Sequence, residues 1–515
     1  MRAFSIFAAF LVLISACTGK LPPEDIPSEE PAKEAGPIFF GLAVKYPQLI
    51  EHLSDTEDYL VELPFDKNDQ MVVTGEGISG TLKYDRFYIF PYAVGFSGYL
   101  TYDGPGGPPA DLVLNVKRIN PSFSNDGNAL TGPAATMGLE EAVNRYGVSS
   151  GTCTYGNPAV ELSQSTAFYS VTMDVTSGFP AGKGNKVTLI DNGKAYGPFD
   201  FDPRSEEALV LALPGGAELT RPMLELDGIA KFPISPDLVP ISQESFVLES
   251  GHHYWESVQL RNLSAEWYFS PAYNTVYYQP DPQTPTRSTI SAFGEAHNVF
   301  LSNINIESNR TAISFGNDTF VWVDGNCRAV STDGSSPAIF IASGSSLHIK
   351  GDGNLIAESN GEGEGGAGIN FGSFQRDCGD IYIEGAVSVQ AKGAAGAAGI
   401  GMGKVTTTQA IEFNCGNIFI NTTGTVKAVG GAGAAGIGSG RLPYWDCSVY
   451  FGSISVLGGI VDATGGGEGA PDIGVCEGAS IPGGVSVGAG VTYDGVHGYH
   501  VVRTDGTVPA AYDKD

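Results

Sequence analysis

Four related segments in the last third of the chain constrain its fold more than any other feature. They begin at Ser346, Asp380, Asn417 and Ser453, a spacing of 34 to 37 residues. Each is followed by a short phrase of small residues around an Ile, such as Ala398-Gly399-Ile400-Gly401. Self-similarity at such a period indicates a stack of repeated structural units.

Apolar residues alternate with other residues inside each segment, which is the period of a β-strand. The predicted inward pairs of the first strand are Leu347/Ile349, Ile381/Ile383, Ile418/Ile420 and Ile454/Val456. Those of a second strand are Leu355/Ala357, Val389/Ala391, Val426/Ala428 and Val461/Ala463. Since no segment holds a plausible amphipathic helix, each is predicted to be one coil of a parallel β-helix, with coils about 4.8 Å apart.

The chain has 515 residues, which is too long for one hydrophobic core and favours several domains. Hydrophobic residues make up 42% of it, enough for packed interiors. The formal charge of −29 argues against nucleic acid and against docking on anionic lipid, because both need clustered Lys and Arg.

The N-terminus has the pattern of an export signal. Arg2 precedes an apolar run from Phe4 to Ile14 that is too short to span a bilayer, and the run ends in Ile14-Ser15-Ala16-Cys17. This ending resembles the bacterial lipobox, which implies removal of residues 1–16 and acylation of Cys17. Residues 17–35 are rich in Pro, Glu and Lys and are predicted to be a flexible tether. An ordinary secretory leader with an incidental Cys is the alternative.

Six further cysteines include four that recur once per repeat, namely Cys378, Cys415, Cys447 and Cys476. This spacing differs from the paired cysteines of zinc sites. A column of stacked thiols is the simplest interpretation, disulfides between adjacent coils come next, and a metal site comes last.

The first half of the chain is predicted to be all-β. Short runs of β-branched and aromatic residues are separated by turn clusters, with two short helices expected at Tyr46–Leu53 and Leu139–Tyr146. This spacing favours two β-sandwich domains, 36–147 and 148–278.

The phrase Leu248-Glu249-Ser250-Gly251-His252-His253-Tyr254, after two sandwich-sized segments behind a lipobox, resembles the fimbrillin-type lipoproteins of Bacteroidetes. The resemblance implies transthyretin-like sandwiches and a place among pilus stalks, tips and anchors. Polymerising members are cleaved after an Arg upstream of the first strands, yet no Arg lies between Arg2 and Arg86. An accessory, tip-like or stand-alone adhesin is therefore expected in preference to a stalk subunit.

Residues 279–287 are rich in Pro and polar residues, and are predicted to be a linker. Residues 288–500 beyond it are predicted to be the parallel β-helix. Residues 338–353 and the Ala-Gly-Ile-Gly phrases that follow are similar to the β-helical repeats of large surface proteins of gut bacteria, described as carbohydrate-binding or pectate-lyase-like, over about residues 288 to 495. That resemblance implies a right-handed parallel β-helix. Residues 501–515 are expected to form a cap or tail.

Enzymes on β-helices need a cation beside calcium-binding carboxylates, or carboxylates on adjacent coils. The cations of the repeats are few: Lys350, Arg376, Lys392, Lys404, Lys427 and Arg441. No catalytic set is evident, and no cofactor is expected. The recurring oxygen-bearing residues Asp377, Asp380, Asn414, Asn417 and Asp446 are candidates for Ca²⁺. The alternative is that they cap turns.

One outward column predicts a binding surface. His348, Tyr382, Phe419 and Ser455 occupy equivalent outward positions, where exposed rings could stack on sugars, with Gln390, Lys427 and Asn417 nearby as hydrogen-bond partners. Cover by a loop or by the preceding domain is the alternative.

The sequence thus predicts a lipid-anchored protein of the outer membrane and cell surface that acts as an adhesin or fimbrial accessory subunit. Its ligand is expected to be a glycan or a surface protein, with fimbrial subunits as further partners. A polysaccharide-binding or polysaccharide-degrading β-helix is the first alternative, and a structural pilus component is the second.

Overall fold

The computed structural model describes most of the chain and is almost entirely β. The described residues are 37–45, 48–52, 58–62, 65–90, 93–175, 178–235, 245–265, 268–269, 274–293, 297–370, 378–405, 412–442, 448–467, 469–476, 479–488 and 492–493. Within them the only α-helix is α2 (Leu139–Tyr146). An all-β fold was predicted and is confirmed. Cys17, the tether and residues 501–515 lie outside the described part.

An eight-stranded sheet forms the first region. Its strands, in spatial order, are β10 (Ala159–Glu161), β1 (Ile38–Lys45), β6 (Ala93–Tyr102), β5 (Ile78–Phe90), β4 (Gln70–Gly75), β7 (Val113–Ile119), β9 (Ser149–Thr154) and β11 (Ser163–Gln164). Neighbours are antiparallel except β1 and β10. Because β9 and β10 follow residue 147 and pair with the earlier strands β7 and β1, the domain boundary predicted at 147 lies inside this sheet.

A buried polar cluster accompanies the apolar core of this sheet. Arg118 and Asp69 are almost completely buried and form an ion pair of 2.7 Å between Nη2 and Oδ2. Asn144 Oδ1 accepts a second hydrogen bond from Arg118 at 2.8 Å, and Asn120 Nδ2 donates to Asp69 at 2.9 Å. Burial raises the pKa of Asp69, and the charge of Arg118 opposes this shift.

The two predicted helices have different outcomes. Helix α2 spans the predicted residues and ends where Gly147 N donates to Val143 O at 2.9 Å. The segment predicted as the other helix instead contains strand β2 (Gln48–His52), which pairs antiparallel with β3 (Asp58–Glu62). Strand β2 also pairs in parallel with His252 and His253, which are distant in sequence. The helix prediction was wrong because such pairing outweighs weak local helix propensity.

Contacts divide the chain into two compact units. The first comprises residues 1–170, 209–218 and 247–255, and the second comprises 171–208, 219–246 and 256–515. The predicted domain 148–278 is thus shared between the units. Strands β12 (Thr166–Val175) and β20 (His252–Asn262) each contain a point of division.

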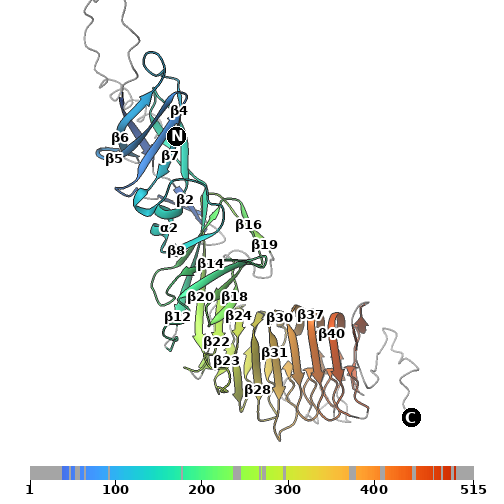
Figure 1. The fold of residues 1–515 in the computed structure, drawn as a ribbon. Helices are drawn as coiled ribbons and strands as arrows, with labels where there is room; N and C mark the ends of the chain where they lie inside the picture. The colour runs from blue at the N-terminus through green and yellow to red at the C-terminus, as the bar shows by residue number, and fades with distance from the viewer. Residues whose placement is uncertain are drawn as a thin grey trace, which may run out of the picture. The chain divides into compact units, whose positions relative to one another are not determined.

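The second unit is dominated by a stack of parallel coils, here named the coil stack. Figure 1 shows its strands side by side from β22 to β40. The first ladder consists of β22 (Asn274–Tyr278), β24 (His297–Ser302), β27 (Thr319–Asp324), β30 (Ser346–Gly351), β33 (Asp380–Gly385), β37 (Ile418–Val429), β40 (Ile454–Thr464) and β43 (Val485–Val487). The strands are parallel throughout.

Three further ladders complete the coils. The second contains β25 (Asn305–Ser308), β28 (Asn326–Ser331), β31 (Asn354–Ser359), β34 (Ser388–Lys392), the later part of β37 and β40, and β44 (Thr492–Tyr493). The third contains β21 (Tyr268–Phe269), β23 (Thr289–Ala292), β26 (Ile313–Phe315), β29 (Ile339–Ile341), β32 (Ile369–Asn370), β35 (Ile400–Gly401), β38 (Ile437–Gly438) and β41 (Ile473–Gly474). The last contains β36 (Glu412–Cys415), β39 (Ser448–Phe451) and β42 (Ala479–Ser480).

The predicted inward residues lie in one continuous core. All sixteen residues of the inward pairs are buried, and they belong to a single apolar cluster that runs along the stack. The register pairs equivalent positions of successive repeats, for example Leu347 with Ile381 and Ile381 with Ile418. The inward apolar residues of each coil therefore pack on the equivalent residues of the next coil.

The recurring Ile-Gly phrase forms the third ladder. Its Ile side chains point into the core, and Gly401 and Gly438 have φ angles of 124° and 132°, which disfavour other residues. A Cβ on Gly438 would overlap the carbonyl oxygen of Gly474 in the next coil. Close stacking of the coils therefore requires glycine here.

Residues 279–287, predicted as a linker, are bonded into the stack. The Gln279 side chain is buried, with Nε2 donating to Asp281 O and Oε1 accepting from Asn305 N at 2.9 Å. Thr286 bridges to Ile306 in parallel. Strands β22 and β24, on either side of this segment, are paired directly. The segment is thus part of a coil, and its polar residues satisfy main-chain groups.

A small antiparallel sheet lies against the first coils within the same unit. Its strands are β14 (Lys194–Asp200), β13 (Lys186–Asp191), β17 (Met223–Leu226) and β18 (Ala230–Pro233). The rings of Phe232 and Phe300 stack with centroids 6.0 Å apart, and Lys231 Nζ lies 2.8 Å from Asp352 Oδ2. The outward face of the early coils is therefore covered at Phe300, which is 2% exposed.

Candidate functional site

An aromatic column runs along the outward face of the first ladder, in coils that follow those covered by β18. Phe320, His348, Tyr382 and Phe419 are register partners in successive coils. The ring centroids of Phe320 and His348 are 4.7 Å apart, those of His348 and Tyr382 are 4.3 Å apart, and those of Tyr382 and Phe419 are 6.0 Å apart. All four are partly exposed. Three of them were predicted as a column, and Phe320 was missed.

The rings of this column stack on one another. His348 and Tyr382 are parallel to within 3°, and Phe320 lies on the other face of His348 at an interplanar angle of 24°. Both faces of His348 and one face of Tyr382 are therefore occupied by neighbouring rings. A sugar that approaches from solvent meets ring edges and the Tyr382 hydroxyl, so the face-on stacking expected from the sequence is not available at His348.

A charged group borders the column. Glu384 Oε2 lies 3.2 Å from His348 Nδ1 and 3.5 Å from Lys350 Nζ. The side chains of His348 and Glu384 are 23% and 27% exposed, so solvent screens this group only in part. Glu384 thus holds the edge of His348 in place.

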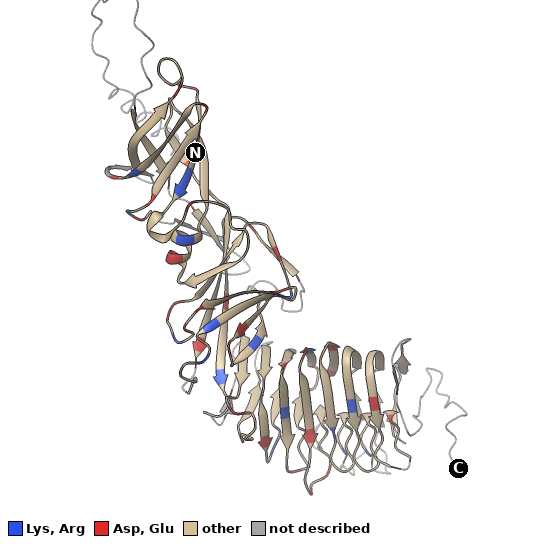
Figure 2. Ribbon diagram, viewed as in Figure 1, with Lys and Arg blue, Asp and Glu red and all other residues tan. Residues whose placement is uncertain are grey.

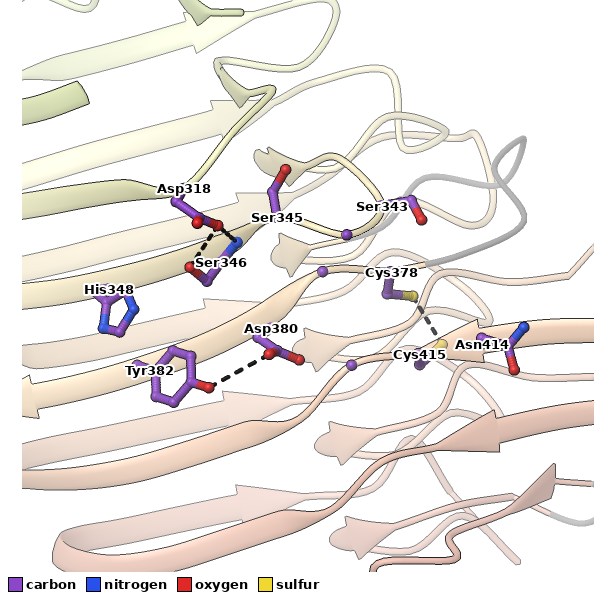
Figure 3. A pocket seen from close by; sticks show the side chains of 13 residues that line it. Asp318, Ser343, Ser345, Ser346, His348, Cys378, Asp380, Tyr382, Asn414 and Cys415 are labelled. Carbon is purple, nitrogen blue, oxygen red and sulfur yellow. Dashed lines mark hydrogen bonds between the residues drawn. The ribbon is translucent and has the colours of Figure 1, made fainter. Parts of the chain in front are cut away.

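A groove of about 560 Å³ opens beside the column and is the candidate site (Figure 3). The residues that line it are Asp318, Ser343, Gly344, Ser345, Ser346, His348, Cys378, Gly379, Asp380, Tyr382, Asn414, Cys415 and Gly416. Most come from the starts of successive first-ladder strands and the turns before them, and Asn414 and Cys415 come from the end of β36. Hydroxyl, carboxylate and amide groups therefore face one hollow because the repeat places equivalent positions in line.

Two carboxylates in the groove bond to the coil that follows each of them. Asp318 Oδ1 accepts from Ser346 N at 2.7 Å and from Ser346 Oγ at 2.8 Å. Asp380 Oδ1 accepts from Asn417 N at 2.6 Å. Figure 3 shows the Asp318–Ser346 bonds and the bond from the Tyr382 hydroxyl to Asp380 Oδ2, which measures 3.4 Å. Partial burial raises the pKa of Tyr382, and nearby carboxylates raise it further, Asp380 foremost.

Two of the predicted calcium residues, Asp380 and Asn417, accept hydrogen bonds from the next coil. Asp380 caps Asn417, and Asn417 Oδ1 accepts from Ser453 Oγ at 2.9 Å, which extends the polar column by one coil. Asn414 lines the groove, while Asp377 and Asp446 lie outside the described residues. Among the described residues no group of three His, Cys, Asp or Glu side chains could hold a metal ion.

The other predicted ligand contacts lie on the second ladder. Gln390 and Lys427 are register partners on β34 and β37, and both are exposed. Gln390 Nε2 donates to Glu358 Oε1 at 3.4 Å. Neither residue lines the groove, and neither does Phe419. The structure thus brings His348 and Tyr382 together in one hollow and leaves the other three candidates outside it.

Sequence reasoning missed Phe320 of the aromatic column and several residues that line the groove. Phe320 could have been found by aligning residues 319–323 with 347–351, since both have alternating apolar positions. Asp318 lies one residue before Thr319, as Ser346 lies one residue before its register partner Leu347, so the same alignment would have found Asp318. Ser343 and Ser345 lie in a turn that carries no such signal.

Charges are distributed singly over the coil stack, as Figure 2 shows, without a large basic patch on the described ribbon. No described helix is long and apolar enough to cross a membrane.

Comparisons with known proteins give weak structural likenesses. No family model matches the chain. No curated protein matches it either. Among solved structures, a putative cell adhesion protein from Bacteroides ovatus is 12% identical, with 43% of this chain and 92% of that one covered at a TM-score of 0.23. A fimbrial assembly protein from Parabacteroides distasonis is 11% identical, with 43% and 91% covered at a TM-score of 0.24.

A tip fimbrial protein from Porphyromonas gingivalis is also similar, at 11% identity, with 43% of this chain and 94% of that one covered and a TM-score of 0.22. The structural neighbours are thus fimbrial and cell adhesion proteins of Bacteroidetes. Scores this low identify neighbours and carry no argument about the function of this chain.

Proposed function

We propose that this chain is a lipid-anchored cell-surface adhesin or fimbrial accessory protein that binds a glycan in the groove of the coil stack. Cys17 would carry the lipid at the outer membrane. The coil stack would be a right-handed parallel β-helix, and the strands before it would form transthyretin-like sandwiches that position it. The lipobox and the fimbrillin resemblance of the sequence support the location.

The groove is the observation that carries the proposal. Its lining combines hydroxyls of serines, the phenol of Tyr382 and the carboxylates of Asp318 and Asp380. Hydroxyl groups of a sugar can both donate to carboxylates and accept from serine hydroxyls. The edges of stacked rings supply apolar contact beside these polar groups. This mixture suits a polyhydroxylated ligand better than an apolar peptide.

The groove lies along the stack axis, and this favours an extended ligand. Successive coils repeat its polar positions, since Asp318 accepts a hydrogen bond from Ser346 N and Asp380 accepts one from Asn417 N. The lining residues belong to four successive coils, which are spaced about 4.8 Å apart, so the groove is longer than it would be in a single coil. An oligosaccharide is therefore a better candidate than a monosaccharide.

A glycan array with the full chain tests the proposal. We expect binding to one class of oligosaccharide, and a loss of at least about tenfold in affinity in Tyr382→Ala, since about 1.4 kcal/mol corresponds to tenfold. Tyr382→Phe keeps the ring stack and removes only the hydroxyl, so a comparable loss there assigns the contact to the phenol.

Lys427→Ala is the matched control, because Lys427 is exposed on the stack and does not line the groove. Unchanged binding is expected for it. Equal losses in Lys427→Ala and Tyr382→Ala would place the ligand elsewhere on the stack, and absence of binding to every glycan would contradict the proposal.

Further assays of the full chain distinguish the alternative functions. A polysaccharide-degrading enzyme would release unsaturated or reducing sugar from pectin-like polymers in the presence of calcium. A structural pilus component would be found in sheared surface filaments and would bind no glycan. The adhesin proposal expects binding without turnover.

A further inference from the structure

Two cysteines of successive coils meet in the wall of the groove. Cys378 and Cys415 both lie three residues before register partners, Ile381 and Ile418, so they hold equivalent positions. Cys378 N donates to Asn414 O at 3.0 Å, which fixes the two main chains side by side. Their Sγ atoms are 2.9 Å apart, and Figure 3 shows the side chains directed toward each other.

The surroundings keep this pair together. Cys378 is 5% exposed and Cys415 is 6% exposed, so neither side chain swings freely in solvent. A Cβ on Gly416, the residue after Cys415, would overlap the Asp380 carboxylate, so the main chains stay close at this level. Neighbouring strands lie about 4.8 Å apart, within the range of about 4.4 to 6.8 Å between Cα atoms that disulfides span. Bonding needs the sulfur atoms to approach by less than about 1 Å, to about 2.05 Å.

Within the described residues, which do not include Cys447, neither of the other two buried cysteines lies beside another cysteine. Cys327 Sγ lies 3.4 Å from Leu301 O, and Cys476 Sγ lies 3.5 Å from Gly433 O. Both sulfur atoms thus contact main-chain carbonyls. The sulfur atoms of Cys378 and Cys415 instead face each other, so this pair differs from the other two buried cysteines.

We propose that Cys378 and Cys415 are an oxidation site at which a disulfide joins two coils of the exported protein. An oxidised dithiol, the usual thiol oxidant of exported proteins, is the co-reactant. One cysteine thiolate attacks its disulfide to give a mixed disulfide, and the second thiolate displaces the oxidant. One S–S bond forms in the protein, one breaks in the oxidant, two electrons pass to the oxidant, and it leaves as a dithiol with the two protons.

The disulfide would hold together two coils that form the wall of the groove. Both cysteines line it, together with Gly379 and Gly416, which follow them in the chain. The bond would fix the distance between the coils that carry Asp380 and Asn417, and it would close a loop of 37 residues. A cross-link here stabilises the wall of the hollow against separation of the coils.

Peptide mapping of the full chain isolated after export tests this inference. The protein is unfolded and alkylated without reductant, then digested. We expect no alkylation at Cys378 or Cys415 and a linked peptide that is about 2 Da lighter than the two thiol peptides together, from the loss of two hydrogens. Cys327 is the internal control and should be alkylated. Alkylation of both Cys378 and Cys415, or a link from either to another cysteine, would overturn the proposal.

A second measurement tests the disulfide without relying on detection of the linked peptide, whose signal can be weak. The urea midpoint of the wild-type coil stack, followed by hydrogen exchange, should fall when reductant is added, whereas that of Cys415→Ser should not respond to reductant. Cys327→Ser should keep the wild-type response. A wild-type midpoint that is insensitive to reductant would also overturn the proposal. Neither measurement depends on glycan binding, so the proposed function is tested separately.

Discussion

The coil stack and the eight-stranded sheet both bury alternating apolar residues, but they fix their strand order differently. In the stack each strand pairs with the equivalent strand of the next coil, as Ile381 does with Ile418. In the sheet, pairing joins distant segments, such as Ala43 with Ala159. The stack is therefore specified by a repeated local rule, whereas the sheet also relies on a unique polar cluster around Arg118 and Asp69.

This difference shows where each region is vulnerable. A repeat tolerates the loss of one polar contact because neighbouring coils supply others, but it cannot tolerate bulk where coils stack. A non-repeating sheet with a buried ion pair has the opposite weakness, since removal of one partner leaves the other charge uncompensated.

The largest effect is expected at the buried ion pair of the sheet. Asp69→Ala leaves the Arg118 guanidinium buried without its carboxylate, and we expect a loss of about 3 to 5 kcal/mol in the free energy of unfolding of this region. Hydrogen exchange of peptides from β4 and β7 measures it. Lys45→Ala, which removes an exposed pair with Glu161, is the control and should cost less than about 1 kcal/mol. Similar losses for both variants would remove the contrast between the regions.

A pH effect of about 3 kcal/mol is expected at His253. It is fully buried, its Nε2 lies 2.7 Å from Ser170 Oγ, and burial lowers its pKa to about 4. The unfolded chain takes up a proton near pH 6.5 while the folded chain does not. Stability should therefore fall between pH 6.5 and about 4, by about 3 kcal/mol at the lower end.

Urea titrations across this range, followed by hydrogen exchange at β20, measure the loss. In His253→Gln the loss of unfolding free energy between pH 6.5 and about 4 should be smaller than in the wild type, by most of the about 3 kcal/mol assigned to His253. An equal pH dependence in the variant would show that other groups cause it.

A smaller loss of about 1 to 3 kcal/mol is expected for Gly438→Ala in the stack, because the added methyl group overlaps Gly474 O. Gly467→Ala is a matched control. Gly467 also has a positive φ, 116°, but a Cβ there meets nothing within 4 Å. The variants therefore separate steric overlap from backbone strain. Hydrogen exchange in β38 and β41 should report the difference, and equal losses would contradict the close-stacking explanation.

The smallest effect is expected at the ion pair between β18 and the stack. Lys231→Ala removes a contact to Asp352 whose carboxylate is 51% exposed, so we expect a loss of less than about 1 kcal/mol. Phe232→Ala, one residue away, removes a buried ring that stacks on Phe300 and should cost about 3 to 5 kcal/mol. Thermal unfolding of the two variants compares them directly. A greater loss in Lys231→Ala would mean that charge holds this sheet to the stack.

The periodic features of the stack were predictable from the sequence. Alternation identified the buried pairs such as Leu347 and Ile349, and repetition placed His348 and Tyr382 in one outward column. The helix at Leu139–Tyr146 was predictable for a similar reason, since its pattern is local.

Features set by distant contacts were not predictable. Residues 279–287 have the composition of a linker, but Gln279 and Thr286 bond to the next coil. The predicted ring-face contact at His348 failed because the distance between coils lets neighbouring rings stack on each other. Composition describes a segment by itself, whereas these outcomes depend on what lies beside it.

The sequence by itself determined the all-β character of the chain, the period of its coils and the inward or outward direction of their side chains. These follow from alternation and repetition, which act over a few residues. Only the tertiary structure decided that β9, β10 and β11 join the first sheet, that residues 279–287 are bonded into a coil, and that neighbouring rings cover both faces of His348. Each of these depends on the spacing between main chains far apart in sequence, and that spacing is set by packing.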